Sequence, residues 1–205
     1  MNIRSYLKKI LLITFLLLPL AKLIWQAYTD TLGANPVEFI THDLGQWALI
    51  MLLLTLSITP WIRLTGMHGA MRYRRTLGLV TFFYACLHFL AYAGLDHWFD
   101  LNTIFHDVYK HPYVMVGALA FALLLPLAVT STDQAMRRMG RSWRRLHRSV
   151  YLVAVLAILH FWWLVKRDVT EPLIYTVILC VLLYARTQSF QSRLSLLRGR
   201  VMSHR

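Results

Sequence analysis

Two histidines lie inside long apolar runs, where a titratable side chain is least expected. His88 falls within YACLHFL (residues 84–90), and His160 falls within AILHFWW (residues 157–163). An ionisable group at membrane depth has no solvent, so it usually either serves a function or hydrogen-bonds a neighbouring helix. Neutral imidazole is also a common axial ligand of haem iron. The two residues are therefore candidates for a shared metal site or for helix packing.

The composition indicates which elements must position these histidines. Of the 205 residues 58% are hydrophobic and 15% charged, with a mean hydropathy of +0.50, whereas soluble domains carry about 25% charged residues. A spanning helix needs about 20 mostly apolar residues. We therefore predict an all-α integral membrane protein with six transmembrane helices. The predicted spans cover residues 10–28, 44–62, 77–95, 114–131, 147–165 and 170–185, followed by a basic cytoplasmic tail at 186–205.

The charges predict the orientation of the bundle. Of the 22 Lys and Arg residues, 18 fall in the N-terminal segment, in the loops after the second and fourth spans, and in the tail. Eight of the nine Asp and Glu residues fall on the opposite side. Under the positive-inside rule both termini are cytoplasmic. The net charge of +13 thus has a topological explanation, and nucleic-acid binding is the weaker interpretation.

The two apolar histidines lie at similar depths. With a rise of 1.5 Å per residue, His88 lies about 16 Å from the start of its span at Leu77, and His160 about 20 Å from His147. A haem held between two helices requires such a match. His147 itself opens the fifth span at its cytoplasmic edge. Since it lies about 140° around a straight helix from His160, both can face the bundle axis only if the helix bends.

Arginines cluster at the cytoplasmic edges of the third and fifth spans. Arg74 and Arg75 precede the third span, and Arg144 and Arg145 belong to a strongly basic stretch at residues 137–148. Such clusters commonly bind anionic lipid headgroups. The alternative is that these arginines pair with haem propionates or with a flavin phosphate.

The remaining motifs limit what the chain can do alone. Cys86 and Cys180 fall inside apolar runs and are interpreted as small buried hydrophobic residues. We find no internal repeat and no glycine-rich nucleotide-binding motif. The loops are too short for a soluble nucleotide-binding domain, so a redox partner has to be another chain.

Three classes of function fit these features. The first is an electron carrier with at least one b-type haem held by His88 and His160. The second is a six-helix transporter or proton channel in which the histidines relay protons, although inverted repeats are not evident. The third is a membrane anchor without a cofactor. Only the first predicts a haem absorption band that shifts on reduction.

Several motifs, in this order along the chain, resemble the MsrQ (formerly YedZ) family of haem-binding membrane subunits. They are GANPV (33–37), His42-x-x-Gly45, RYRRTLGL (72–79) followed by His88, HPY (111–113), AVTS (128–131), and GRSWRRLH (140–147) followed by VYLV (150–153) and His160. The resemblance covers nearly the whole chain and implies a single ferric-reductase-like transmembrane domain over residues 1–205.

The resemblance also implies a role in the bacterial inner membrane. Members of this family take electrons from the respiratory quinone pool, with FMN as a further cofactor. They pass the electrons to a periplasmic molybdopterin-dependent reductase, which repairs methionine sulfoxide in envelope proteins.

Transferred position by position, the family's histidines fall on His88, His147 and His160, and we expect His88 and His160 to hold an outer b-type haem. In the wider superfamily of ferric reductases and NADPH oxidases, two histidines on each of two helices bind two haems. Here Arg74 and Arg75 occupy the positions where the inner partner of His147 is expected. His147 therefore either binds a second haem with another ligand or belongs to a quinone or flavin site.

Overall fold

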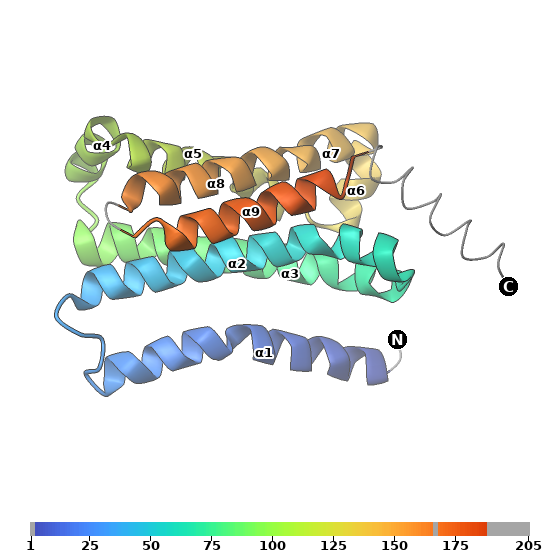
Figure 1. Cartoon of the computed structure of the whole chain (residues 1–205), viewed down its shortest axis with the longest axis horizontal. Helices are drawn as coiled ribbons and strands as arrows, with labels where there is room; N and C mark the ends of the chain where they lie inside the picture. The colour runs from blue at the N-terminus through green and yellow to red at the C-terminus, as the bar shows by residue number, and fades with distance from the viewer. Residues whose placement is uncertain (1–2, 166–167, 188–205) are drawn as a thin grey trace, which may run out of the picture.

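The computed structural model describes residues 3–165 and 168–187, and within these ranges the chain is helical with no strand (Figure 1). The six long helices are α1 (Ile3–Tyr28), α2 (Pro36–Thr65), α3 (Met71–Ala91), α5 (Pro112–Val129), α8 (Val150–Leu164) and α9 (Thr170–Tyr184). The shorter elements are η1 (His68–Ala70), η2 (Tyr92–Asp96), α4 (Leu101–Lys110), α6 (Asp133–Met139), α7 (Arg141–Leu146) and η3 (His147–Ser149).

The long helices run side by side along one axis, and the short ones gather at the two ends (Figure 1). Helix α4 and the connection between α1 and α2 lie at one end. Helices α6 and α7 lie at the other end, where α1 begins and α9 finishes. The basic stretch of the sequence is therefore at the opposite end of the bundle from α4.

Local sequence signals fix the ends of α2, the central helix. Asn35 caps its first turn by accepting a hydrogen bond from the Glu38 amide at 3.3 Å, and the Asn35 amide group donates to the Glu38 carboxylate at 2.8 Å. Pro36 is the first helical residue, where its missing N–H costs nothing. Gly66, with φ of 75°, ends the helix in a left-handed conformation that glycine adopts readily.

Five helical stretches in the described ranges are long and apolar enough to cross a membrane. They are Tyr6–Tyr28, Pro36–Thr65, His68–Asp96, Pro112–Val129 and Arg141–Leu164, and they overlap the first five predicted spans. Helix α9 is apolar but has 15 residues, which is about 22 Å at 1.5 Å per residue. The hydrocarbon core is about 30 Å thick, so the sixth crossing stays a prediction. Of the predicted tail at 186–205, only Arg186 and Thr187 lie within the described residues.

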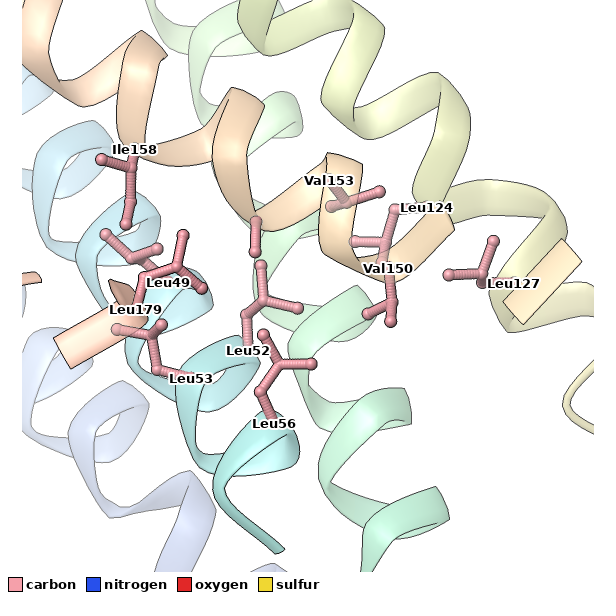
Figure 2. Close-up of a cluster of buried hydrophobic side chains, with 11 residues drawn as sticks. Leu49, Leu52, Leu53, Leu56, Leu124, Leu127, Val150, Val153, Ile158 and Leu179 are labelled. Carbon is pink, nitrogen blue, oxygen red and sulfur yellow. The ribbon is translucent and has the colours of Figure 1, made fainter. Parts of the chain in front are cut away.

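Helix α2 packs against α5, α8 and α9 through one apolar cluster, shown in Figure 2. The cluster consists of Leu49, Leu52, Leu53, Leu56, Leu124, Leu127, Val150, Val153, Ala154, Ile158 and Leu179. Because lipid is as apolar as leucine, close packing rather than the hydrophobic effect favours such contacts within a bilayer.

A second apolar cluster joins α1 to α2 and α3. Its central residue is Tyr84 of α3, which is fully buried and donates its hydroxyl hydrogen to the backbone oxygen of Leu16 at 2.9 Å. Most of α1 is otherwise uncovered by protein, since Leu11 and Phe15 remain 67% and 68% exposed. The Tyr84 hydrogen bond is therefore a main polar contact that holds α1 to the rest of the bundle.

We predict that Tyr84→Phe lowers the free energy of unfolding by about 0.5–1.5 kcal/mol, because it removes one buried hydrogen bond without changing the ring. Unfolding in mixed micelles with increasing SDS, followed by tryptophan fluorescence, measures this loss. Tyr109→Phe is the matched control, since Tyr109 is 90% exposed. Equal stability of the two variants would contradict the role given to Tyr84.

Candidate metal centre

The structure brings together the two histidines that lie in apolar runs. His88 comes from α3 and His160 from α8, and their ring centroids are 6.2 Å apart with ring planes at 75°. Both side chains are partly buried within the bundle. Residues 72 positions apart in the sequence thus form one site with a pair of imidazoles.

Each imidazole is held by a backbone carbonyl of the neighbouring helix. The Nδ1 atom of His88 lies 2.8 Å from the oxygen of Thr41 in α2, and the Nδ1 atom of His160 lies 2.7 Å from the oxygen of Tyr113 in α5. A carbonyl oxygen can only accept, so Nδ1 carries the proton in both rings. Each Nε2 atom is then left with a free lone pair, which is the form that binds a metal.

Glycines allow the imidazoles to approach these helices. A Cβ atom added at Gly45 would lie 2.9 Å from the His88 ring, and one added at Gly117 would lie 2.8 Å from the His160 ring. Real Cβ atoms essentially never come so close to another heavy atom. Any other residue at either position would therefore displace the imidazole or separate the helices.

The two halves of the site repeat one design. In each half the accepting carbonyl lies 47 residues before the histidine, and the glycine follows the carbonyl by one helical turn. The pattern Ala-x-Leu-His-Phe also occurs at both histidines, at residues 85–89 and 157–161. Our sequence analysis found no internal repeat and gave no role to Gly117, Thr41 or Tyr113. The repeated five-residue pattern signals that the two histidines are equivalent, but it does not extend to Thr41, Tyr113 or Gly117.

The spacing of the rings suits one metal ion with the two histidines on opposite sides. Metal–imidazole bonds are about 2.0 Å long and each ring centre lies about 1 Å beyond its nitrogen, so the ring centres should be about 6 Å apart. In the described part of the chain, no group of three or more His, Cys, Asp or Glu side chains could hold a metal. The other ligands of such an ion would have to come from a cofactor.

Aromatic rings stack between α3 and α5. Phe121 of α5 stacks on Phe89 of α3 with ring centroids 5.1 Å apart, and on Phe82 at 6.1 Å. The ring centroids of Tyr113 and His160 are 6.1 Å apart. The Tyr113 ring thus contacts one imidazole of the pair, whereas Phe89 is 39% exposed.

His147 lies in a different environment, at the start of the helical stretch that ends beyond His160. The 3₁₀ turn η3 begins at His147 and separates α7 from α8. Its Nε2 atom lies 3.0 Å from the hydroxyl oxygen of Thr130, and its ring stacks on Trp143 at 3.9 Å. The Thr130 hydroxyl donates its hydrogen to the backbone oxygen of Pro126 at 2.6 Å. The Nε2–H of His147 is therefore the donor in the hydrogen bond between His147 and Thr130.

The four candidate arginines do not form one cluster. Arg74 is partly buried and is close enough to His147 to influence its charge. Arg75 is exposed and forms a salt bridge of 2.9 Å with Asp133. Arg144 and Arg145 are exposed on α7. Only Arg74 therefore shares an environment with His147.

A fifth arginine, which the sequence analysis assigned only to the basic tail, reaches into the bundle. Arg186 donates hydrogen bonds to the hydroxyl of Tyr151 and to the backbone oxygen of Leu56, and its guanidinium lies 5.1 Å from the Tyr151 ring centre. Burial lowers the pKa of Arg186, the Tyr151 contact opposes this shift, and repulsion from Arg74 and Arg63 adds to it. Arg186 thus joins the end of α9 to α2 and α8.

Comparisons with known proteins give the family. The sequence model of the family described as "Ferric reductase like transmembrane component" matches residues 44–158, a range that includes His88 and His147. Curated relatives carry the name protein-methionine-sulfoxide reductase heme-binding subunit MsrQ.

The relative from Herminiimonas arsenicoxydans is 49% identical over 83% of this chain and 79% of its own length. The relative from Xanthomonas axonopodis pv. citri is 52% identical over 78% of this chain and 73% of its own length. The relative from Bordetella pertussis is 47% identical over 86% of this chain and 87% of its own length. No solved structure matches this chain.

Five apolar helices of sufficient length, together with a transmembrane family match, show a multi-pass membrane protein. With identities near 50% over more than three quarters of its length, the chain belongs to the MsrQ family of ferric reductase like transmembrane components.

Proposed function

We propose that the chain is a haem b electron carrier of the bacterial inner membrane that serves a separate periplasmic methionine sulfoxide reductase. The observation that carries this proposal is the pair of imidazoles of His88 and His160, spaced for one metal ion and both protonated at Nδ1. The names of the relatives, as heme-binding subunits of a protein-methionine-sulfoxide reductase, support it.

A haem fits the donor set of this site. His88 and His160 would hold the iron through their two imidazoles, and a porphyrin would supply the ligands that the described part of the chain does not offer. When bound, the haem iron accepts and releases one electron at a time. Hydrogen bonds from Nδ1 to the Thr41 and Tyr113 oxygens fix the ring orientation and make each Nε2 a better donor. Stronger donation favours the ferric iron and so lowers the reduction potential.

The proposed topology has six spans, with α9 as the sixth and with both termini in the cytoplasm. Its support is the unequal distribution of charge between the two ends of the bundle, with the basic helix α7 at one end and α4 at the other (Figure 1). In this orientation His147 lies near the cytoplasmic side. Residues 1–205 form a single domain, without a role in nucleic-acid binding.

We place the entry of electrons at His147. A quinol loses two protons when it is oxidised, and an imidazole is a suitable acceptor for one of them. Trp143 stacks on His147 and Thr130 orients it, so the ring is held at one angle. Arg74, Arg75, Arg144 and Arg145 supply positive charge for FMN, haem propionates or lipid headgroups, with Arg74 next to His147.

The electron acceptor in this proposal is the molybdopterin-dependent catalytic subunit on the periplasmic side. The chain itself is then the electron-transfer subunit and not the catalytic subunit. Its own side chains hold the carrier, keep water away and guide the protons of the donor.

The first test is a difference spectrum of the purified chain in detergent, reduced against oxidised, with a haem assay. We expect the spectrum of a low-spin b-type haem at about one per chain. We further predict that His88→Ala and His160→Ala each lose nearly all haem, because a single axial ligand remains. His106→Ala, at an exposed histidine, is the control. Normal haem content in both variants would refute the site, and absence of haem from the intact chain would favour a transporter.

The glycines give a second prediction. Gly45→Ala and Gly117→Ala should each weaken haem retention by about 10- to 100-fold, because the new methyl group breaks the hydrogen bond that orients the ligand. Gly69→Ala is the matched control, since nothing lies within 4 Å of its added Cβ. Haem loss measured during dilution into excess apomyoglobin gives the result. Retention equal to that of Gly69→Ala would show that the close approach is not needed.

His147 gives a third prediction. His147→Ala should keep the haem of the His88–His160 pair but slow its reduction by a quinol about tenfold or more, since a proton acceptor is lost. Stopped-flow absorbance after mixing with a soluble quinol measures the rate. His68→Ala, at an exposed histidine in η1, is the control. Loss of haem in His147→Ala would instead indicate that His147 is an iron ligand.

A further inference from the structure

One carboxylate connects the two halves of the histidine site. Asp107 of α4 accepts a hydrogen bond from the Tyr92 hydroxyl at Oδ2, with a distance of 2.7 Å. Its other oxygen, Oδ1, lies 2.7 Å from Nδ1 of His111. The two oxygens of a single side chain therefore bind residues from two different parts of the bundle.

Both partners of Asp107 are close in sequence to the paired imidazoles. Tyr92 follows His88 by one helical turn, at the point where α3 passes into η2. His111 is the N-cap residue of α5, and Tyr113, two residues later, provides the carbonyl that binds His160. The Asp107 carboxylate thus fixes the end of the His88 helix relative to the start of the helix that orients His160.

Further contacts make this connection rigid. His97 lies with Nε2 3.7 Å from Oδ2 of Asp107 and with Nδ1 3.2 Å from the backbone oxygen of Tyr92. Its ring centroid is 4.4 Å from that of Tyr92. On the other side, the ring centroids of His111 and Tyr113 are 5.7 Å apart. Asp107 therefore has hydrogen-bond partners in η2 and at the junction of α4 and α5, with the His97 ring packed beside Tyr92.

The carboxylate is well suited to accept the hydrogen bonds from Tyr92 and His111. Its side chain is only 20% exposed. Desolvation raises the pKa of Asp107, but hydrogen bonds from Tyr92 and His111, together with the nearby histidines, outweigh this effect and hold it below the ordinary value. Asp107 is thus ionised at neutral pH, and an ionised carboxylate has no proton of its own to compete with the donors.

Asp107 is not needed to form its own helix. The N-cap of α4 is Asp100, which accepts a hydrogen bond from the Asn102 amide at 3.0 Å and another from the Thr103 hydroxyl. Asp107 lies in the second turn, and its side chain bonds Tyr92 of η2 and His111, the residue that joins α4 to α5. This division allows the two acidic residues to be tested against each other.

We propose that Asp107 is a positioning residue that sets His88 and His160 at the separation an iron requires. The inference rests on the proposed function, because it takes these two imidazoles as axial ligands. Tyr92 and His111 transmit the constraint, one to each half of the site. Removal of the carboxylate lets α5 and the end of α3 move apart, and one imidazole then leaves the iron more readily.

Binding of carbon monoxide to the dithionite-reduced protein tests this proposal. Reduced haem with two histidine ligands excludes carbon monoxide until one ligand leaves. We expect the haem-bound carbon monoxide fraction to rise about tenfold or more in Asp107→Ala, the effect typical of losing an outer-shell partner. Tyr92→Phe removes one of the two hydrogen bonds and should give a smaller rise. Tyr92→Phe also tests the proposal if Asp107→Ala does not fold.

Asp100→Asn is the matched control, because it removes a charge from the same helix while asparagine remains a good N-cap. It should behave like the unaltered chain. Carbon monoxide binding in Asp107→Ala and Tyr92→Phe equal to that of Asp100→Asn would overturn the proposal, as would an equal rise in all three. An unaltered chain that holds no haem, or that binds carbon monoxide fully, would instead refute the haem site itself, before any variant is compared.

Discussion

The hydrogen bond from an imidazole N–H to a helix carbonyl is the interaction on which this structure depends. In an apolar interior the second nitrogen of each histidine has to be satisfied, and the Thr41 and Tyr113 oxygens do this at 2.8 and 2.7 Å. A carbonyl inside a helix can accept a side-chain donor only if that side chain comes close to the backbone. Gly45 and Gly117 permit this approach. The close packing of α2 on α3 and of α5 on α8 at this depth thus allows each imidazole Nδ1–H to find a hydrogen-bond acceptor.

Much of this could be predicted from sequence, and the parts that could not share a physical cause. Five spans followed from hydropathy because hydrocarbon imposes the same requirement on every crossing. The proximity of His88 and His160 followed from their similar depth in two different spans. The accepting carbonyls did not, because a bond across 47 residues leaves no local pattern. Gly117 resembled any other small residue of a membrane helix. Arg186, interpreted as part of a cytoplasmic tail, in fact binds Leu56 and Tyr151, which charge counting cannot reveal.

The two ends of the bundle differ in chemistry. At the end with α6 and α7, cationic side chains predominate, and the polar contacts of His147 are with a hydroxyl and an indole ring. At the end with α4, Asp107 gathers a phenol and two imidazoles around a carboxylate. Between these ends lies the buried aliphatic cluster of Figure 2. Such a separation is consistent with the proposed function, in which electrons enter near His147 and leave at the opposite side of the membrane.

The unequal lengths of the helices affect how the protein fits its bilayer. Helix α2 has 30 residues and α9 has 15, which correspond to about 45 Å and 22 Å against a hydrocarbon thickness of about 30 Å. Under the proposed six-span topology, the lipids beside α9 would have to compress, or the helix recruit polar flanking groups, at a cost of fractions of a kcal/mol per Å of mismatch. The perimeter of the bundle therefore has no single hydrophobic thickness. Acyl chain length becomes a variable that acts on one face of the protein and not on the other.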